Sequence, residues 1–181
     1  MLRLPVPDFM TTSIVLTVVS DDHPGIVEAL SDVLARHAGN WSESSMMSLA
    51  GKFAGILLAE LPENSAESFV ADLAALEDRG IRVLAQRSGA AEHDDSARRV
   101  TLELVGQDRA GIVHDITEIL ARHAVNVQEL ETTVQSASMS GESLFLAHAR
   151  MSVPDSVNME RLREELEALA NELMVDITFK Q

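Results

Sequence analysis

The feature that most constrains the fold of this chain is an internal repeat. Residues 20–44 and 106–130 align without a gap at a shift of 86 positions, and eleven of the 25 aligned residues are identical. The identities include the tripeptide Gly-Ile-Val at 25–27 and at 111–113. Because an ungapped match of this length is not expected by chance, the sequence predicts two copies of one structural unit.

The hydrophobic pattern of each copy predicts the same order of six elements. Apolar and polar residues alternate over 14–18 and 100–104, as in a half-buried strand, and a helical apolar stripe follows each stretch. The first copy then has predicted strands at 43–50 and 52–61, a helix at 65–79 and a strand at 81–85. The second copy has predicted strands at 128–137 and 142–151 around a turn at 138–141, a helix at 156–173 and a strand at 175–179.

This order places the chain in the α+β class, as two ferredoxin-like βαββαβ units. Each unit is expected to form an antiparallel four-stranded sheet with two helices on one face. The predicted parts are an N-terminal tail at 1–11, a first unit at 12–87, a small polar linker at 88–97 and a second unit at 98–181. A unit of about 80 residues is marginally stable alone, so we expect the two copies to pack on each other, by sheet edge or sheet face.

Composition argues against several classes of protein. The 181 residues carry a formal net charge of −15, which repels phosphate backbones, and Lys and Arg form no basic stripe. The absence of cysteine excludes disulfides and thiolate metal sites. No apolar run reaches the ~18 residues of a membrane span, and the N-terminus does not resemble a secretory signal. We therefore expect a cytoplasmic protein that contacts neither nucleic acid nor membrane.

The sequence also lacks the motifs of catalysis and of cofactor binding. It has no P-loop, Gly-x-Gly-x-x-Gly, Gly-x-Ser-x-Gly or His-Glu-x-x-His segment. The six histidines are dispersed. The pair His114-Asp115 could bind a metal ion, but the aligned pair Glu28-Ala29 could not do the same. We expect a chain that is not an enzyme and that uses no cofactor and no metal.

The segment between the first strand and the first helix carries a recognisable signature. Asp-His-Pro-Gly-Ile-Val at 22–27 resembles the signature of ACT domains, and Asp-Arg-Ala-Gly-Ile-Val at 108–113 resembles it again, with Ala110 in place of the usual proline. Asn40 and Asn126 match the hallmark asparagine that follows the first helix. Two ACT units without an attached enzyme resemble the glycine cleavage system transcriptional repressor family.

The resemblance implies a small regulatory ligand, often an amino acid, in a pocket that a neighbouring ACT unit completes. The residues suit this role, because a helix N-terminus offers unpaired N–H groups to a carboxylate and a glycine lets a ligand approach the backbone. An asparagine can both donate and accept hydrogen bonds. The candidate ligand-binding residues are Asp22, His23, Gly25, Ile26, Val27 and Asn40 in the first copy, and Asp108, Arg109, Gly111, Ile112, Val113 and Asn126 in the second.

These candidates also have purely structural interpretations. The two glycines could serve tight helix–sheet contact, and the two asparagines could hold a turn. Asp22 and Asp108 stand where helix N-caps are expected. His23 and the aligned Arg109 could face an anionic ligand or only solvent.

Other conspicuous side chains are better explained by structure. His37 and His123 each follow an arginine near a helix C-terminus, where a cation complements the helix dipole. Trp41 aligns with Val127, which favours packing in the core or at an interface.

The resemblance implies a regulator of transcription that senses glycine and binds a LysR-type activator of the glycine cleavage genes, without touching DNA. A homodimer is a further expectation. Two alternatives remain open: a stand-alone ACT sensor that controls a metabolic enzyme allosterically, and a regulatory remnant related to formyltetrahydrofolate deformylase. In the latter case the activity should be absent, because the chain lacks the catalytic domain.

Overall fold

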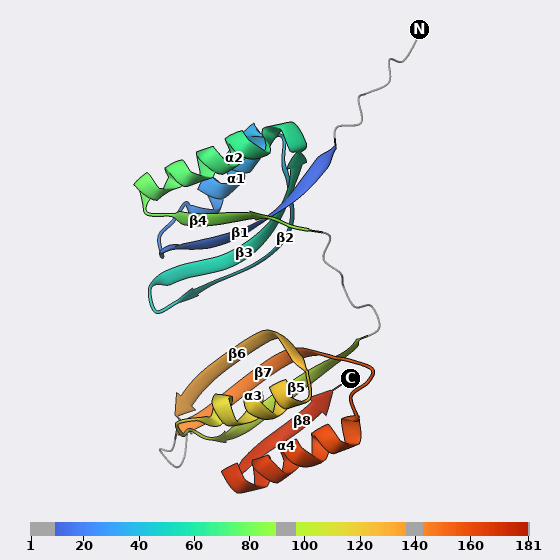
Figure 1. Ribbon diagram of the computed structural model, residues 1–181. Coiled ribbons are helices and arrows are strands. Elements are labelled where there is room, and N and C mark those ends of the chain that lie inside the picture. Colours follow the sequence, from blue (N-terminus) through green and yellow to red (C-terminus); the bar gives the residue numbers. More distant parts are fainter. Residues whose placement is uncertain (1–9, 90–96, 137–142, 181) are drawn as a thin grey trace. The chain divides into compact units, whose positions relative to one another are not determined.

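The computed structural model describes residues 10–89, 97–136 and 143–180. The chain divides into two compact units, unit 1 (residues 1–92) and unit 2 (residues 93–181), and Figure 1 shows both. The predicted turn at 138–141 lies outside the described residues, as do most of the predicted tail and linker.

Unit 1 follows the predicted β-α-β-β-α-β order. Two short 3-10 helices, η1 and η2, flank its second helix. The elements are β1 (Thr11–Asp21), α1 (Ile26–Arg36), β2 (Asn40–Leu49), β3 (Lys52–Pro62), η1 (Glu63–Ser65), α2 (Ala66–Ala74), η2 (Ala75–Arg79) and β4 (Arg82–Arg87). The strands form one antiparallel sheet in the order β2-β3-β1-β4, and both α-helices cover the same face of it (Figure 1).

Unit 2 repeats this architecture. Its elements are β5 (Arg98–Gln107), α3 (Ile112–Arg122), β6 (Asn126–Ser136), β7 (Ser143–Val153), α4 (Met159–Leu173) and β8 (Val175–Lys180). The antiparallel sheet has the order β6-β7-β5-β8, again with both helices on one face (Figure 1). The predicted α+β class and the tandem ferredoxin-like units are therefore confirmed.

Each unit has a separate hydrophobic core between its helices and its sheet. Alternate residues of the central strands, Ile14, Leu16 and Val18 in β1, are at most 1% exposed, and their counterparts in β5 are also buried. Helix α1 contributes a stripe spaced as the sequence predicts, and α3 repeats it. Since a helix pair covers only one face, the other face of each sheet contains none of these core residues.

Two predicted helices differ from the structure at their ends. The helix predicted over 65–79 is α-helical only from Ala66 to Ala74 and continues as η2 to Arg79, before Gly80 with a φ of 78°. The second begins at Met159 rather than at residue 156, because Asn158 caps it. The Asn158 Oδ1 accepts hydrogen bonds from the N–H groups of Glu160 and Arg161 (3.0 and 3.1 Å), which fixes the start of α4.

The hairpin between β2 and β3 turns at Ala50 and Gly51. Both residues have positive φ, 50° and 76°. Two successive residues of this kind are typical of a type I′ turn, which matches the right-handed twist of the strands it joins. The predicted hairpin around Gly51 is confirmed.

The first helix of each unit ends on a strained alanine. Ala38 and Ala124 occupy equivalent positions after α1 and α3, with φ of 53° and 55°. A Cβ makes this left-handed conformation unfavourable, and glycine usually occupies the position.

We expect Ala38→Gly or Ala124→Gly to stabilise its unit by about 0.5–1 kcal/mol, because glycine relieves the strain at positive φ. Urea unfolding of the full chain measures the change. Ala71→Gly, at an exposed position in the middle of α2, is the matched control and should destabilise the unit by about 1 kcal/mol. Equal destabilisation by all three variants would contradict the assignment of strain.

Candidate functional site

The turn from the first strand to the first helix of each unit passes through a left-handed glycine. Helices α1 and α3 begin at Ile26 and Ile112, and the preceding residues, Gly25 and Gly111, have φ of 95° and 93°. A Cβ placed on either glycine would meet no other part of the chain closer than 3.6 Å. Backbone conformation therefore requires glycine here, and tight helix–sheet contact does not.

The expected N-caps, Asp22 and Asp108, do not cap these helices. The first helical residue comes four positions after each aspartate, and the N-cap immediately before it is a glycine, which has no side chain to offer. Asp22 instead accepts a hydrogen bond from the Ser48 hydroxyl (2.5 Å), and its N–H donates to the Gly51 carbonyl (3.0 Å). The N–H of Asp108 donates to the Ser143 carbonyl (2.8 Å). The prediction was wrong because the intervening turn directs each aspartate toward the neighbouring hairpin.

Both helix N-termini lack a side-chain cap. The carbonyls of Gly25 and Gly111 accept the N–H groups of Ala29 and Asp115 (3.0 and 2.9 Å), which are the first regular bonds of the two helices. The N–H groups of the preceding residues have no acceptor within the helix. Because the helix dipole adds partial positive charge there, each N-terminus suits an anion such as a carboxylate.

An acidic side chain from the first helical turn lies beside each glycine. The Glu28 Oε2 is 3.6 Å from the Cβ position of Gly25, and the Asp115 Oδ2 is 3.8 Å from that of Gly111. The alignment of the two repeats does not pair these two carboxylates, because Glu28 aligns with a histidine and Asp115 with an alanine. An acidic residue in the first turn of both helices was the signal that could have revealed it.

The aligned residues His23 and Arg109 make different contacts. The His23 Nδ1 lies 3.0 Å from the Pro24 carbonyl oxygen, whereas the Arg109 guanidinium forms an ion pair with Asp115 (2.8 Å). Arg109 thus adds a cation close to the N-terminus of α3. Asp115 is engaged in this ion pair, and the described residues contain no cluster of three or more His, Asp or Glu side chains that could hold a metal ion.

The two hydrophobic residues of each signature face opposite ways. Ile26 and Ile112 are 3% and 2% exposed and belong to the cores of their units. Val27 and Val113 are 47% and 39% exposed. A ligand at the helix N-terminus could therefore contact the valine side chains, but only the backbone of the isoleucines.

The hallmark asparagines lie far from the signature loops of their own units. Asn40 begins β2 and pairs with Glu60, which in turn pairs with Ser13 near the start of β1, whereas the loop follows Asp21 at the end of β1. Eight residues of strand separate Ser13 from Asp21, a distance of roughly 26 Å. Asn126 has the equivalent position in unit 2. The two features therefore cannot hold one small ligand within a single unit.

His37 and His123 join the two helices of their units. The Nε2 of His37 lies 3.0 Å from Asp72 on α2, and the Nε2 of His123 lies 3.2 Å from Glu165 on α4. The preceding arginines, Arg36 and Arg122, contact the same carboxylates, at 3.2 and 3.6 Å. Both imidazoles are largely buried, with 13% and 15% of the side chain exposed. These contacts explain why the Arg-His pair occurs in both copies.

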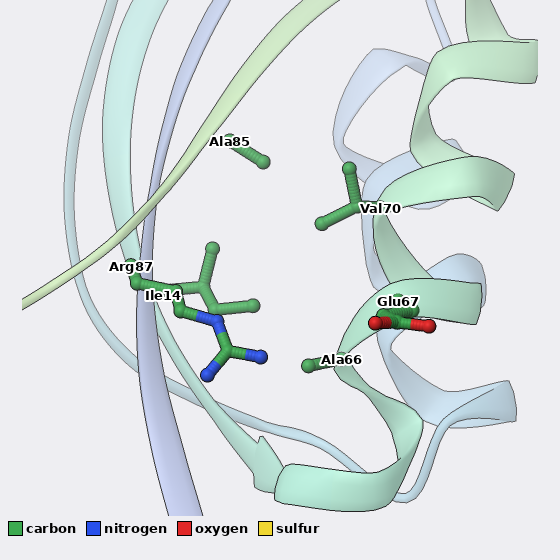
Figure 2. Close-up of a pocket in the computed structure, with 6 residues that line it drawn as sticks. All are labelled: Ile14, Ala66, Glu67, Val70, Ala85 and Arg87. Carbon is green, nitrogen blue, oxygen red and sulfur yellow. The ribbon is translucent and has the colours of Figure 1, made fainter.

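In unit 1, α2 and β4 enclose a hollow of about 280 Å³. Figure 2 shows Glu67 and Val70 on α2 facing Ile14 and Arg87, with Ala85 also lining the space. The Arg87 guanidinium is already paired with Glu63 on η1 (2.6 Å). None of the residues that line this hollow is among the ligand-binding residues predicted from the sequence.

Unit 2 has a large side chain at the equivalent place. The strand pairings align Ala85 with Phe179, since Leu84 opposes Thr17 on β1 while Thr178 opposes the corresponding Glu103 on β5. Arg163 of α4 lies over the Phe179 ring, 5.6 Å from its centre. The hollow therefore distinguishes unit 1 from unit 2.

Comparison with known proteins identifies the class. The ACT-domain family model matches residues 12–82 and again residues 98–180. The chain therefore belongs to the ACT-domain family, with two copies of the domain.

Three relatives illustrate the range of this similarity. A UPF0237 protein of Methanopyrus kandleri is 32% identical over 80 residues, which are 44% of this chain and 82% of that protein. The crystal structure of an unknown protein from Galdieria sulphuraria has a TM-score of 0.85 at 29% identity, with 94% of this chain and 98% of that one covered. A candidate glycine cleavage system transcriptional repressor shares the fold, with a TM-score of 0.68 at 19% identity and coverage of 94% and 97%.

Within the described ranges, no helix has both the length and the apolar character that a membrane crossing requires.

The contact between His123 and Glu165 gives a prediction about acid stability. The hydrogen bond from His123 is the main cause that lowers the pKa of Glu165 below its ordinary value of 4.5; Arg161 and Arg122 lower it further, while burial opposes them. A carboxyl group with a lowered pKa in the folded state stabilises the fold above its unfolded-state pKa. That stability is lost as the pH falls through the folded-state pKa.

We expect Glu165→Gln to lower the free energy of unfolding near pH 7, with the difference from wild type shrinking as the pH falls below the ordinary pKa of 4.5. Urea unfolding between pH 3 and 7 measures it. Glu164→Gln, an exposed neighbour on α4, is the control and should leave the pH profile unchanged. A wild-type advantage over Glu165→Gln that is the same at every pH would contradict the assigned role.

Proposed function

We propose that this chain is an amino-acid-responsive regulator that binds its ligand at the N-termini of α1 and α3 and acts through a protein partner. One observation carries the proposal: in both units an uncapped helix N-terminus, a left-handed glycine and a first-turn carboxylate lie together. Membership of the ACT-domain family supports a regulatory role rather than catalysis.

The chemistry of this arrangement suits a small α-amino acid. Its carboxylate would accept hydrogen bonds from the free N–H groups of the first helical turn, and its ammonium would contact Glu28 or Asp115. Each carboxylate lies within 4 Å of the neighbouring glycine's Cβ position, so the two charged ends of the ligand must be close together. Glycine meets this condition with the smallest volume, and alanine and serine follow.

The partner is proposed to be a protein that itself contacts DNA. With a formal net charge of −15 the chain repels nucleic acid, so a basic DNA-binding surface must come from elsewhere. The fold shared with a candidate glycine cleavage system transcriptional repressor makes a LysR-type activator of glycine cleavage genes the first partner to test. The alternative is a metabolic enzyme under allosteric control, which affinity capture from native lysate would identify instead.

Ligand binding can be tested by calorimetry with glycine, alanine and serine. The best small ligands gain about 1.5 kcal/mol per heavy atom, which limits glycine to roughly 7 kcal/mol and a Kd of about 10 µM or weaker. The double variant Glu28→Gln/Asp115→Asn should weaken binding at least tenfold, because it removes both ammonium partners.

Two further variants localise the site. Ala85→Phe introduces the unit 2 residue and fills the hollow beside α2. Because the proposed site lies at the helix N-termini, this variant should bind the amino acid as wild type does. Loss of binding in this variant would instead place the site in the hollow. Asn40→Ala should also bind the amino acid normally, because Asn40 lies at the far end of β1 from the signature loop of its unit. No heat from any of the three amino acids at millimolar concentration would overturn the sensor proposal.

Partner dependence can be tested by gel mobility on a glycine cleavage promoter. The purified chain alone should not retard the DNA even at ~50 mM salt, where electrostatic binding is strongest. It should further retard the complex of that DNA with the activator, and saturating glycine should change its affinity for the complex 5–150-fold. Specific retardation of DNA by the chain alone would contradict the proposal.

A further inference from the structure

The face of the unit 1 sheet opposite its helices is unusually apolar. Side chains on this side, here called the unit 1 outer face, come from all four strands. Five of them are strongly exposed: Leu49 (69%), Leu84 (59%), Met47 (58%), Ile56 (54%) and Val19 (47%). Val15 and Leu58 lie on the same face and are half-buried.

The strand register makes these residues one continuous surface. Thr17 at the centre of β1 is flanked by Ile56 on β3 and Leu84 on β4. Two residues away along β1, Val15 pairs with Leu58, and in the other direction Val19 pairs with Ala54. Since alternate residues of a strand share a face, the apolar side chains cover several consecutive rows of the sheet.

The equivalent face of unit 2 is more polar and more highly charged, although Val105, Leu144 and Leu146 also lie on it. The strand pairings place His148 at the position of Ile56, Arg150 at that of Leu58 and Thr178 at that of Leu84. Arg150 forms an ion pair with Glu129, and Lys180 forms one with Glu103 (2.6 Å). The two sheets, which have the same origin, therefore differ in the polarity of this face, while both keep apolar residues toward their helices.

This difference indicates which surface can cover the unit 1 outer face. An apolar surface is matched by another apolar surface, because burying the charges of the unit 2 face would cost desolvation energy. Among the described residues, only the unit 1 sheet presents such a face. The matching surface is therefore the same face of a second molecule of this chain. A contact between two identical faces forms around a two-fold axis.

Charge at the two ends of the face fits this arrangement. Lys52 and Arg82 lie at one end, where Lys52 also pairs with Asp21, and Glu43 and Glu60 lie at the other. A two-fold axis that runs between the two facing sheets, parallel to them and perpendicular to the strands, brings the basic end of one copy onto the acidic end of the other. The apolar rows then meet in the middle.

The area is sufficient for a specific contact. Four strands spaced about 4.8 Å apart, with an average length of roughly 30 Å, give a face of about 600 Å² per copy. Two such faces bury roughly 1,200 Å², the lower limit of stable specific interfaces. A monomer that exposed this much contiguous apolar surface would be prone to aggregate.

We propose that the unit 1 outer face is a self-association surface, on which the same face of a second copy packs to form a two-fold homodimer. This proposal is independent of the ligand and of the partner proposed above. It predicts that residues transplanted from unit 2 abolish the dimer without unfolding the sheet. Unit 2 has the same fold and carries these residues at the equivalent positions.

Sedimentation equilibrium of the full chain tests the proposal. Wild type should be a dimer at micromolar concentration, and Ile56→His/Leu58→Arg/Leu84→Thr should be a monomer with an unchanged circular dichroism spectrum. Leu146→Thr, on the corresponding face of unit 2, is the control and should remain dimeric. A wild type that stays monomeric at about 100 µM, or a folded triple variant that still dimerises, would overturn the proposal.

Cross-linking gives a second test that does not weaken the interface. The chain has no cysteine, so a single introduced thiol is unique. Thr17→Cys, at the centre of the face, should give covalent dimers with a bis-maleimide that spans about 10 Å, the spacing of packed sheets. The equivalent Glu103→Cys in unit 2 should not. Equal yields from both positions, or dimers from Glu103→Cys alone, would place the contact elsewhere.

Discussion

The structure of each unit depends on the turn by which the first strand passes into the first helix. That turn needs a residue with φ near 95°, which only glycine adopts without strain, and Gly25 and Gly111 supply it. Because the turn reverses the chain immediately, the helix packs across the strand it has just left and buries Ile26 or Ile112 in the core. The same glycine leaves the helix N-terminus without a side-chain cap. One backbone requirement thus produces both the packing and the candidate binding site.

Duplication explained the fold, and divergence between the copies explains what is specific to each unit. The inner faces of the two sheets conserve their apolar pattern because each must cover a helix pair. The copies still differ in detail: at the β4 edge of the inner face Ala85 leaves a hollow where Phe179 fills the space, and on the outer face Ile56 stands where unit 2 has His148. Both sheets keep equivalent strand orders despite these differences, so each of the two positions is free to acquire a separate role.

The sequence predicted the elements and the tandem architecture well, because period-two and helical patterns report directly on burial. It failed where the outcome depended on local turn geometry or on distance through the fold. Asp22 was expected to cap α1, but the turn directs it to Ser48. Asn40 was grouped with the signature loop, yet the sheet register places it at the other end of β1. Glu28 was missed because its counterpart beside Gly111 is Asp115, one position further along the helix.

The central claim is that a small amino acid binds at the N-termini of α1 and α3. Its most direct measurement is a titration of the isotope-labelled chain with glycine, followed through the backbone amide resonances. The account predicts that the largest shifts fall on the amides of Gly25, Ile26 and Val27 and on those of Gly111, Ile112 and Val113, since their N–H groups would donate to the ligand carboxylate. Shifts concentrated instead around Ala85 and Arg87, or no shifts at millimolar glycine, alanine or serine, would contradict it.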